Sequence, residues 1–180
     1  MSDSVTDAEA IGRVRAGDTE AFGILMDRYG GQCTAYAKYM TGSLDEAADI
    51  VQEALVRAYR SLNRCNDPDR FKGWLFRILR NQCRTHLARR RRRQHQPLSD
   101  ELPAPGTSDA ATDAEEVRRK VHEALQRLSV EHREALVLKY VHDMSLPDMA
   151  ELLGASISAL KMRLQRGRLA LREKLGGVMP

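Results

Sequence analysis

The sequence has few aromatic residues and no long apolar run. Aromatic side chains make up 5% of the 180 residues, although apolar residues reach 42%. A core can therefore form, and aliphatic side chains must fill most of it. No stretch approaches the roughly 20 apolar residues that a membrane-spanning helix needs, and the N-terminus MSDSVTDAEA lacks the features of a secretion signal. We therefore expect no membrane insertion and a cytoplasmic location.

Cysteine and catalytic motifs are also scarce. Cys33, Cys65 and Cys83 are odd in number and widely spaced, which favours small core residues in a reducing compartment over a disulfide framework. No glycine-rich phosphate loop, metal-spaced carboxylate cluster or nucleophile motif occurs. Cys83 and His86 could supply two corners of a zinc site, but no second close pair accompanies them. We expect neither an enzyme nor a bound cofactor.

Positive charge is missing from residues 96–112, and the net charge differs strongly from one segment of the chain to the next. The net charge of +4 combines −6 in residues 1–55, +11 in residues 56–95, −3 in residues 96–112 and +2 in residues 113–180. A second basic cluster lies within residues 161–174. Two separate basic patches indicate two contacts with a polyanion, although solvated helix faces are the alternative interpretation.

Alternating apolar runs typical of strands are absent as well, and apolar residues recur at helical spacing. The proline-rich acidic stretch 96–112 interrupts this pattern. The sequence thus predicts an all-α protein with two small helical domains, 1–95 and 113–180, joined by a flexible acidic linker.

Local signals predict where several helices begin and end. Thr6 with Glu9 and Ser43 with Glu46 form capping boxes. The pair Gly30-Gly31 could kink or interrupt a helix.

The C-terminal domain contains the pattern of a helix-turn-helix. Ser145 can cap a short helix, Gly154 suits a left-handed residue after it, and Ser156 can cap a second helix. One face of this second helix would contact the major groove or its phosphates. The residues predicted for this face are Ser158, Lys161, Met162, Gln165, Arg166 and Arg168. A helical hairpin with a basic face is the alternative.

The N-terminal domain carries two faces of opposite charge. Asp49, Gln52, Glu53 and Val56 share one helix face, and an acidic stripe of this kind suits a basic protein surface or is simply solvated. The following helix, from Phe71 to about Arg93, has an opposite character.

Basic side chains on that helix lie near aromatic ones. Arg77, Arg80 and Arg84 are expected to face solvent close to Trp74, as is the arginine block 89–93. This combination suits unstacked single-stranded bases. Phe71 and Leu75 are expected in the core, whereas Trp74 fits either place.

The sequence closely resembles the extracytoplasmic-function group of bacterial RNA polymerase sigma factors. The resemblance covers residues 7 to about 175. It rests on the segments GDTEAFGILMDRY, LDEAADIVQEALVRAYRSL, RFKGWLFRILRN and RRRRR and on the helix-turn-helix.

The resemblance implies roles for these residues. Asp49, Gln52, Glu53 and Val56 would bind core RNA polymerase. The loop Asn63–Asp69 would hold a base flipped from the minus-ten element, and the basic helix would bind the melted strand. The residues implied in minus-ten binding are Asn63, Asn66, Asp67, Asp69, Lys72, Trp74, Arg77, Arg80 and Arg84.

The resemblance also implies that domain 1–95 is sigma region 2 and domain 113–180 is sigma region 4. Region 4 would contact minus-thirty-five DNA through Lys161, Gln165 and Arg166, and the acidic linker would lie in a positively charged path of the polymerase. An anti-sigma factor would be a further partner.

Several positions depart from the family pattern. Met162 stands where a small polar residue is usual, and Gly167 replaces a usual alanine. Thr85 and Cys65 replace a common aspartate and an often aromatic loop residue. A helix-turn-helix regulator that is not a polymerase subunit is the alternative function. It would need a sensor half with strands, which residues 1–95 do not indicate.

Overall fold

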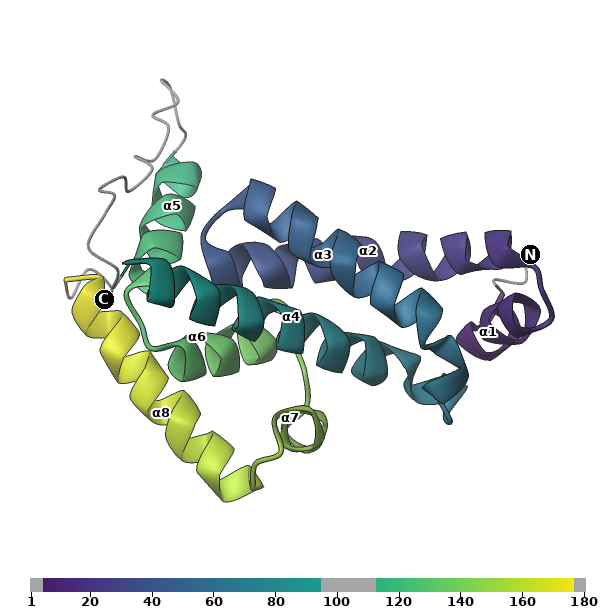
Figure 1. Ribbon diagram of the computed structural model, residues 1–180. Helices are drawn as coiled ribbons and strands as arrows, with labels where there is room; N and C mark the ends of the chain where they lie inside the picture. The colour runs from purple at the N-terminus through teal and green to yellow at the C-terminus, as the bar shows by residue number, and fades with distance from the viewer. Residues whose placement is uncertain (1–4, 95–112, 177–180) are drawn as a thin grey trace.

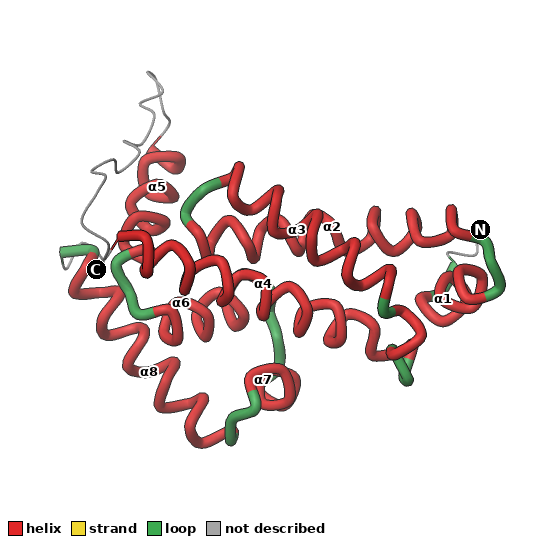
Figure 2. The backbone as a smooth tube through the Cα atoms, in the orientation of Figure 1, coloured by secondary structure: helices red, strands yellow, loops and turns green. Residues whose placement is uncertain are grey.

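The computed structural model describes residues 5–94 and 113–176, and this part of the chain is helical without a strand (Figures 1 and 2). The expectation of an all-α fold is confirmed. None of the described helices is long and apolar enough to cross a membrane. The predicted linker 96–112 lies outside the described residues, and the two domain boundaries stay a prediction.

The N-terminal unit contains four helices and three short 3-10 turns. The elements are α1 (Asp7–Arg15), η1 (Thr19–Ala21), α2 (Phe22–Thr41), α3 (Leu44–Arg60), η2 (Leu62–Arg64), η3 (Pro68–Arg70) and α4 (Phe71–Gln94). Helices α2, α3 and α4 pack side by side around a core in which Tyr36, Phe71, Leu75 and Phe76 are completely buried. The expectation that Phe71 and Leu75 are core residues is confirmed.

The C-terminal unit contains four helices and one π-helical turn. The elements are α5 (Asp113–Gln126), α6 (Val130–Leu136), η4 (Val137–Val141), α7 (Leu146–Leu153) and α8 (Ile157–Lys174). Helix α8 packs along α6, and α7 precedes it to complete the predicted helix-turn-helix (Figure 1).

The predicted caps determine where the helices begin. Thr6 and Glu9 form a reciprocal capping box, whereas Ser43 accepts a hydrogen bond from the backbone N–H of Glu46 without the reciprocal bond. Ser145 and Ser156 accept from the backbone N–H of Asp148 and Ala159 in the same way. Each cap satisfies a donor that the first helical turn leaves unpaired.

Two glycine predictions have different outcomes. Gly154 ends α7 with a φ of 62°, as expected for a left-handed residue. Gly30 and Gly31 do not interrupt α2, which continues to Thr41. The neighbouring Tyr29 and Cys33 are buried against the core, and this packing outweighs the low helix propensity of two glycines.

Gly167 allows a close approach between α8 and α6. A Cβ atom at this position would lie 3.3 Å from Leu136 Cγ and 3.5 Å from His132 Cβ. The contact with Leu136 is tight, so an alanine here would require that side chain to shift by a few tenths of an ångström, whereas the contact with His132 is an ordinary van der Waals distance. The glycine therefore fits the close packing of α8 on α6.

The two units pack against each other through polar contacts that are largely buried. The side-chain amide of Gln126 donates to the backbone oxygen of Tyr39 at 2.8 Å, and the Arg133 guanidinium donates to the Met40 backbone oxygen. The phenol of Tyr36 donates to Glu134 at 3.0 Å. Figure 1 shows α6 lying directly beside α4, so side chains of these two helices, such as Arg80 and Glu134, can contact each other.

Candidate nucleic-acid interfaces

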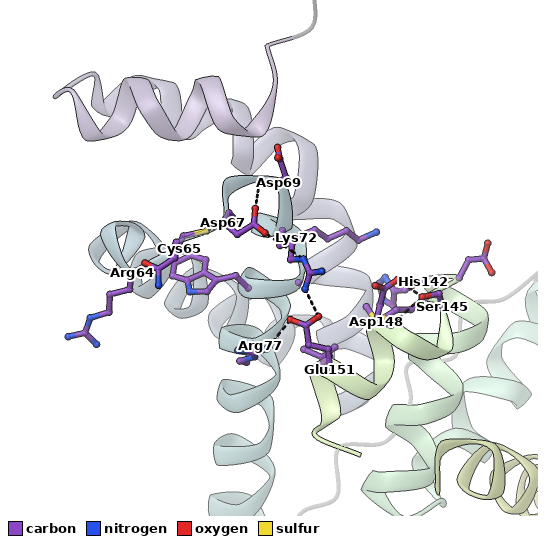
Figure 3. A pocket seen from close by; sticks show the side chains of 17 residues that line it. Arg64, Cys65, Asp67, Asp69, Lys72, Arg77, His142, Ser145, Asp148 and Glu151 are labelled. Atoms are coloured by element: carbon purple, nitrogen blue, oxygen red, sulfur yellow. Dashed lines mark hydrogen bonds and ion pairs between the residues drawn. The ribbon is translucent and has the colours of Figure 1, made fainter. Parts of the chain in front are cut away.

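A cavity of about 590 Å³ lies where the loop after α3 and the start of α4 face α7 (Figure 3). One side of it contains six of the nine residues expected to contact minus-ten DNA: Asn66, Asp67, Asp69, Lys72, Trp74 and Arg77. The other side contains acidic and polar residues of the C-terminal unit, among them Asp148 and Glu151. Residues distant in the sequence thus form one recess with charged walls.

Trp74 has features of both roles considered for it, a core residue and a surface for base stacking. Its ring is half-buried against Phe71, with the ring centroids 5.8 Å apart, and it also lines the cavity. The indole is held by the core while part of it stays accessible. This geometry suits a surface on which a base can stack.

Two of the cations at the cavity are paired across the two units. Arg70 Nη1 lies 2.9 Å from Glu151 Oε2. Arg77 Nη2 lies 3.6 Å from Glu151 Oε1, a pair that Figure 3 shows. All three side chains remain more than half exposed. The Glu151 carboxylate on α7 therefore occupies the place where an arginine could otherwise hold a phosphate oxygen.

Arg80 and Arg84 do not line this cavity. The sequence predicted that Arg80 faces solvent, and this prediction is wrong. Only 16% of the Arg80 side chain is exposed, and its Nε lies 2.9 Å from Glu134 Oε1. Arg84 Nη1 lies 3.4 Å from Glu134 Oε2, with the side chain 40% exposed. Arg80 is covered because α6 packs over this part of α4 and places the completely buried carboxylate of Glu134 against it.

The arginine block at the end of α4 is also not uniformly free. Arg90 bridges to Glu46 at 3.3 Å and to the backbone oxygen of Thr41 at 3.2 Å, so its predicted exposure is wrong in part. Arg89, Arg92 and Arg93 are exposed. Asn63 is exposed too, but it does not line the cavity.

The recognition face of α8 is open. All six residues predicted for it are exposed, namely Ser158, Lys161, Met162, Gln165, Arg166 and Arg168. Leu160 and Leu164 on the opposite side are buried at 0% and 8% exposure. The amphipathic pattern thus gives a helix whose polar face is long enough to lie in a major groove.

The stripe on α3 is exposed as predicted and borders an apolar groove. Asp49, Gln52, Glu53 and Val56 are all exposed. The groove between α2 and α3 has a volume of about 550 Å³. Its apolar lining includes Met26, Val56 and Tyr59, which are 43%, 41% and 40% exposed.

Titratable groups at the contact between the units have altered pKa values. Burial raises the pKa of Tyr36 well above its usual range, and the Glu134 charge adds to this. Burial lowers the pKa of Arg133 to about 10, with Arg91 and Arg90 adding repulsion. Burial also lowers the pKa of His142 to about 4, with a further contribution from Lys72.

The three cysteines are buried and free, as expected for core residues. Burial raises the pKa of Cys33 and Cys83 to about 12 and that of Cys65 above its usual range. These thiols are therefore protonated at neutral pH and weak nucleophiles. Within residues 5–94 and 113–176, no three His, Cys, Asp or Glu side chains are placed to hold a metal ion.

The sequence reasoning missed three features of these surfaces. Glu134 and Glu151 appeared as ordinary helix carboxylates, because nothing local links them to arginines 54 and 81 residues away. The apolar groove beside α3 was also missed. The pattern of α2 could have indicated it, since Met26 broadens the apolar face beyond what one core contact needs.

Comparison with known proteins identifies the family. The model of Sigma-70 region 2 matches residues 25–93, and that of Sigma-70 region 4 matches residues 118–171. The ECF RNA polymerase sigma factor SigM of Mycobacterium tuberculosis is 32% identical over 171 residues, which is 95% of this chain and 85% of that protein. SigW of Bacillus subtilis is 29% identical over 92% of this chain and 94% of its own length.

Solved structures agree with this result. CnrH, determined in complex with the cytosolic domain of CnrY, has a TM-score of 0.70 and 30% identity, covering 98% of this chain and 99% of that chain. The sigma factor RpoE from Bartonella quintana, in complex with the anti-sigma factor NepR, has a TM-score of 0.72 and 26% identity over 89% of this chain and 99% of that chain.

The chain belongs to the extracytoplasmic-function RNA polymerase sigma factors. It therefore functions as a sigma factor in transcription initiation. The alternative of a helix-turn-helix regulator outside the polymerase is not supported, because the region 2 match occupies the N-terminal half in place of a sensor domain.

Proposed function

We propose that this chain is a non-enzymatic specificity subunit that binds core RNA polymerase in the cytoplasm through α3 and contacts promoter DNA at two places. The observation that carries the proposal is the position of the acidic stripe beside an apolar groove, within the segment matched by Sigma-70 region 2. The groove can accept apolar side chains of a partner helix, while Asp49 and Glu53 attract its basic residues.

The loop 63–69 and the start of α4 form the minus-ten site of this proposal. Asn66, Asp67 and Asp69 offer hydrogen-bonding groups to a flipped base at the cavity, and Trp74 offers a ring for stacking. Arg77, Arg80 and Arg84 bind the phosphates once Glu134 and Glu151 have moved away. Flipping a base costs a few kcal/mol, which stacking and charged contacts offset.

The open face of α8 is the minus-thirty-five site. Lys161, Gln165 and Arg166 contact base edges there, and Arg168 holds the backbone. Docking on polymerase fixes the spacing of the two DNA sites, so specific binding requires the complex.

Regulation by an anti-sigma factor is part of the proposal. It is supported by the similar structure of RpoE, which was determined with the anti-sigma factor NepR. Pull-down from the native host should recover a small partner protein that disappears under inducing stress. Recovery of polymerase alone in both resting and stressed cells would indicate control by expression.

The proposal is tested by run-off transcription with core polymerase on a genomic fragment library. The wild-type chain should select promoters and give permanganate-reactive thymines near the minus-ten element, whereas the free chain should give none. Asp49→Lys with Glu53→Lys should abolish core binding without changing the melting temperature, because both side chains are exposed.

A matched control is Glu131→Lys with Glu173→Lys, which makes the same charge change on exposed residues of the C-terminal unit. This control should still comigrate with core polymerase in a native gel. Equal binding by the two double variants would show that the α3 stripe is only a solvated face.

A further inference from the structure

Arg15 connects the first helix to the loop after α3. This residue lies in the last turn of α1, 47 and 50 residues before the groups that it contacts. Its Nη2 donates to the Leu62 backbone oxygen at 3.0 Å and to the Cys65 backbone oxygen at 2.6 Å. One guanidinium nitrogen thus joins the two ends of the turn that leads into the loop.

The two acceptor oxygens lie at the two ends of the 3-10 turn η2 that follows α3. The Leu62 oxygen also accepts the backbone N–H of Cys65 at 3.0 Å, so Arg15 adds a second donor there. A guanidinium group presents its donors in a fixed, planar arrangement. Leu62 and Cys65 are also buried, at 3% and 1% exposure, so side-chain packing and the arginine hold the same two residues.

The residues next to these anchors are exposed. Asn63 and Arg64 lie between the two carbonyl groups, and Asn66 follows directly. Their backbone has little freedom while both anchors are in place. Asp67 extends the ordered turn, because its Oδ1 accepts the backbone N–H of Asp69 at 3.1 Å.

Helix α1 is itself firmly attached to the core. Ala10 and Ile11 are completely buried, and Asp7 contacts both Arg28 and Tyr29 of α2. The Arg15 side chain therefore extends from a fixed helix. A support of this kind can define the loop geometry more closely than the loop residues can alone.

We propose that Arg15 is a positioning residue for base recognition, which acts by holding the backbone of loop 63–69 in the conformation that presents Asn63 and Asn66. The inference rests on the proposed role of this loop in minus-ten binding. Arg15 acts through the two backbone carbonyl groups, and the contact with the base is made by the loop. Loss of these bonds leaves the fold in place and gives the loop more conformations.

The test measures base preference with the full chain bound to core polymerase. The probe is a pool of single-stranded DNA with eight randomised positions between constant ends, and bound strands are sequenced. The variants are Arg15→Gln, Arg15→Lys and Asn66→Ala. Arg13→Gln is the matched control, because Arg13 belongs to the same helix and forms an exposed pair with Asp18 at 2.7 Å.

At the recognised position, the enrichment of the most preferred base over the least preferred base should fall by about tenfold in Arg15→Gln, as the loss of two charge-assisted hydrogen bonds suggests. Arg15→Lys should restore part of this enrichment, and Arg13→Gln should leave it unchanged. Core binding should match that of the wild type in all three arginine variants, and Arg15→Gln should still fold cooperatively, with a melting temperature only a few degrees lower.

Other outcomes separate this inference from the function on which it rests. If Asn66→Ala removes the preference and Arg15→Gln does not, the positioning role is wrong while the loop function stands. Equal weakening for all bases together with a much lower melting temperature would show Arg15 to be merely structural. If the wild-type complex has no base preference, the proposed loop function itself is wrong.

Discussion

Helices α4 and α8 both carry rows of cations, but the two rows differ in whether carboxylates pair with them. On α4, Arg77 is paired with Glu151, and Arg80 and Arg84 are paired with Glu134. On α8, Lys161, Arg166 and Arg168 are exposed and form no ion pair with the described residues. The comparison shows that basic residues at helical spacing do not by themselves define a surface available to DNA.

The two carboxylates that cover α4 differ in their surroundings. The Glu134 side chain is completely buried and contacts Tyr36, Arg80 and Arg84. The Glu151 side chain is 55% exposed. A buried carboxylate depends on its partners to offset lost hydration, whereas an exposed pair is screened by water and salt.

This difference has a consequence for DNA binding. Arg80 is 16% exposed and paired with Glu134, so we expect phosphates to reach this part of α4 only when the two units move apart. The face of α8 needs no such movement. The experiments below alter the two surfaces separately.

Removal of the buried carboxylate should have the largest effect. Glu134→Ala leaves Arg80 and Tyr36 without their partner, and we expect a loss of about 3–5 kcal/mol in the contact between the units. Calorimetry should detect a lower melting temperature. The emission of Trp74, the single tryptophan, should shift to longer wavelength as the cavity opens to water.

Glu131→Ala on the same helix is the control, because Glu131 is exposed. It should change stability by less than about 1 kcal/mol. Unchanged melting and emission in Glu134→Ala would contradict a role of this group in holding the units together.

Changes on the open surface should affect recognition without affecting stability. Lys161→Ala, Gln165→Ala and Arg166→Ala should each cost about 1–3 kcal/mol at the preferred upstream element. Arg168→Ala should weaken binding to all sequences and reduce the salt slope by about one. Fluorescence anisotropy of the complex on promoter and scrambled duplexes measures both effects, and uniform losses from all four would mean that α8 only holds phosphates.

His142 should make a smaller contribution, which is a dependence of folding stability on pH. Its ring lies against Tyr36 and Phe76, with ring centroids 5.9 and 5.2 Å away. Its pKa falls from 6.5 to about 4 in the folded chain. Between these values the unfolded chain binds a proton that the folded chain does not, so stability falls as the pH is lowered from about 6.5 toward 4.

His142→Phe keeps a ring at this position and removes the titration. Urea midpoints measured at pH 7 and pH 5 should differ less in this variant than in the wild type. The same pH dependence in both proteins would exclude His142 as its source.

The exposed carboxylate should matter least. Glu151→Gln removes the pairs with Arg70 and Arg77, and we expect a change within about 1 kcal/mol, because all three side chains are well exposed. The effect should disappear in high salt. A loss as large as that of Glu134→Ala, found by melting at low and high salt, would remove the distinction between the two carboxylates.

Much of the fold could be predicted because its signals are local. Ser145 and Ser156 cap helices by accepting hydrogen bonds from residues three positions ahead. Gly154 ends α7 because glycine adopts the left-handed conformation without strain. The exposed faces of α3 and α8 follow from helical periodicity in the same way. Six residues of the expected minus-ten site also meet at one cavity, although their contacts with DNA stay a prediction.

The errors lie where distant segments meet. Arg80 was expected in solvent, yet it is covered by a carboxylate 54 residues further along the chain. The Gly30-Gly31 pair was expected to be able to kink or interrupt a helix, yet packing of α2 keeps the helix continuous. No spacing rule within one helix contains this information.

The sequence by itself determined the helices, their caps, the helix-turn-helix and the family, because each depends on residue order within one element or on motifs that relatives share. Only the tertiary structure decided which cations are open. The Tyr36 phenol reaches Glu134 across 98 residues, and the pairing depends on two helices burying that carboxylate between them. A charge count cannot distinguish a paired arginine from a free one, because desolvation and partner distance exist only in the folded chain.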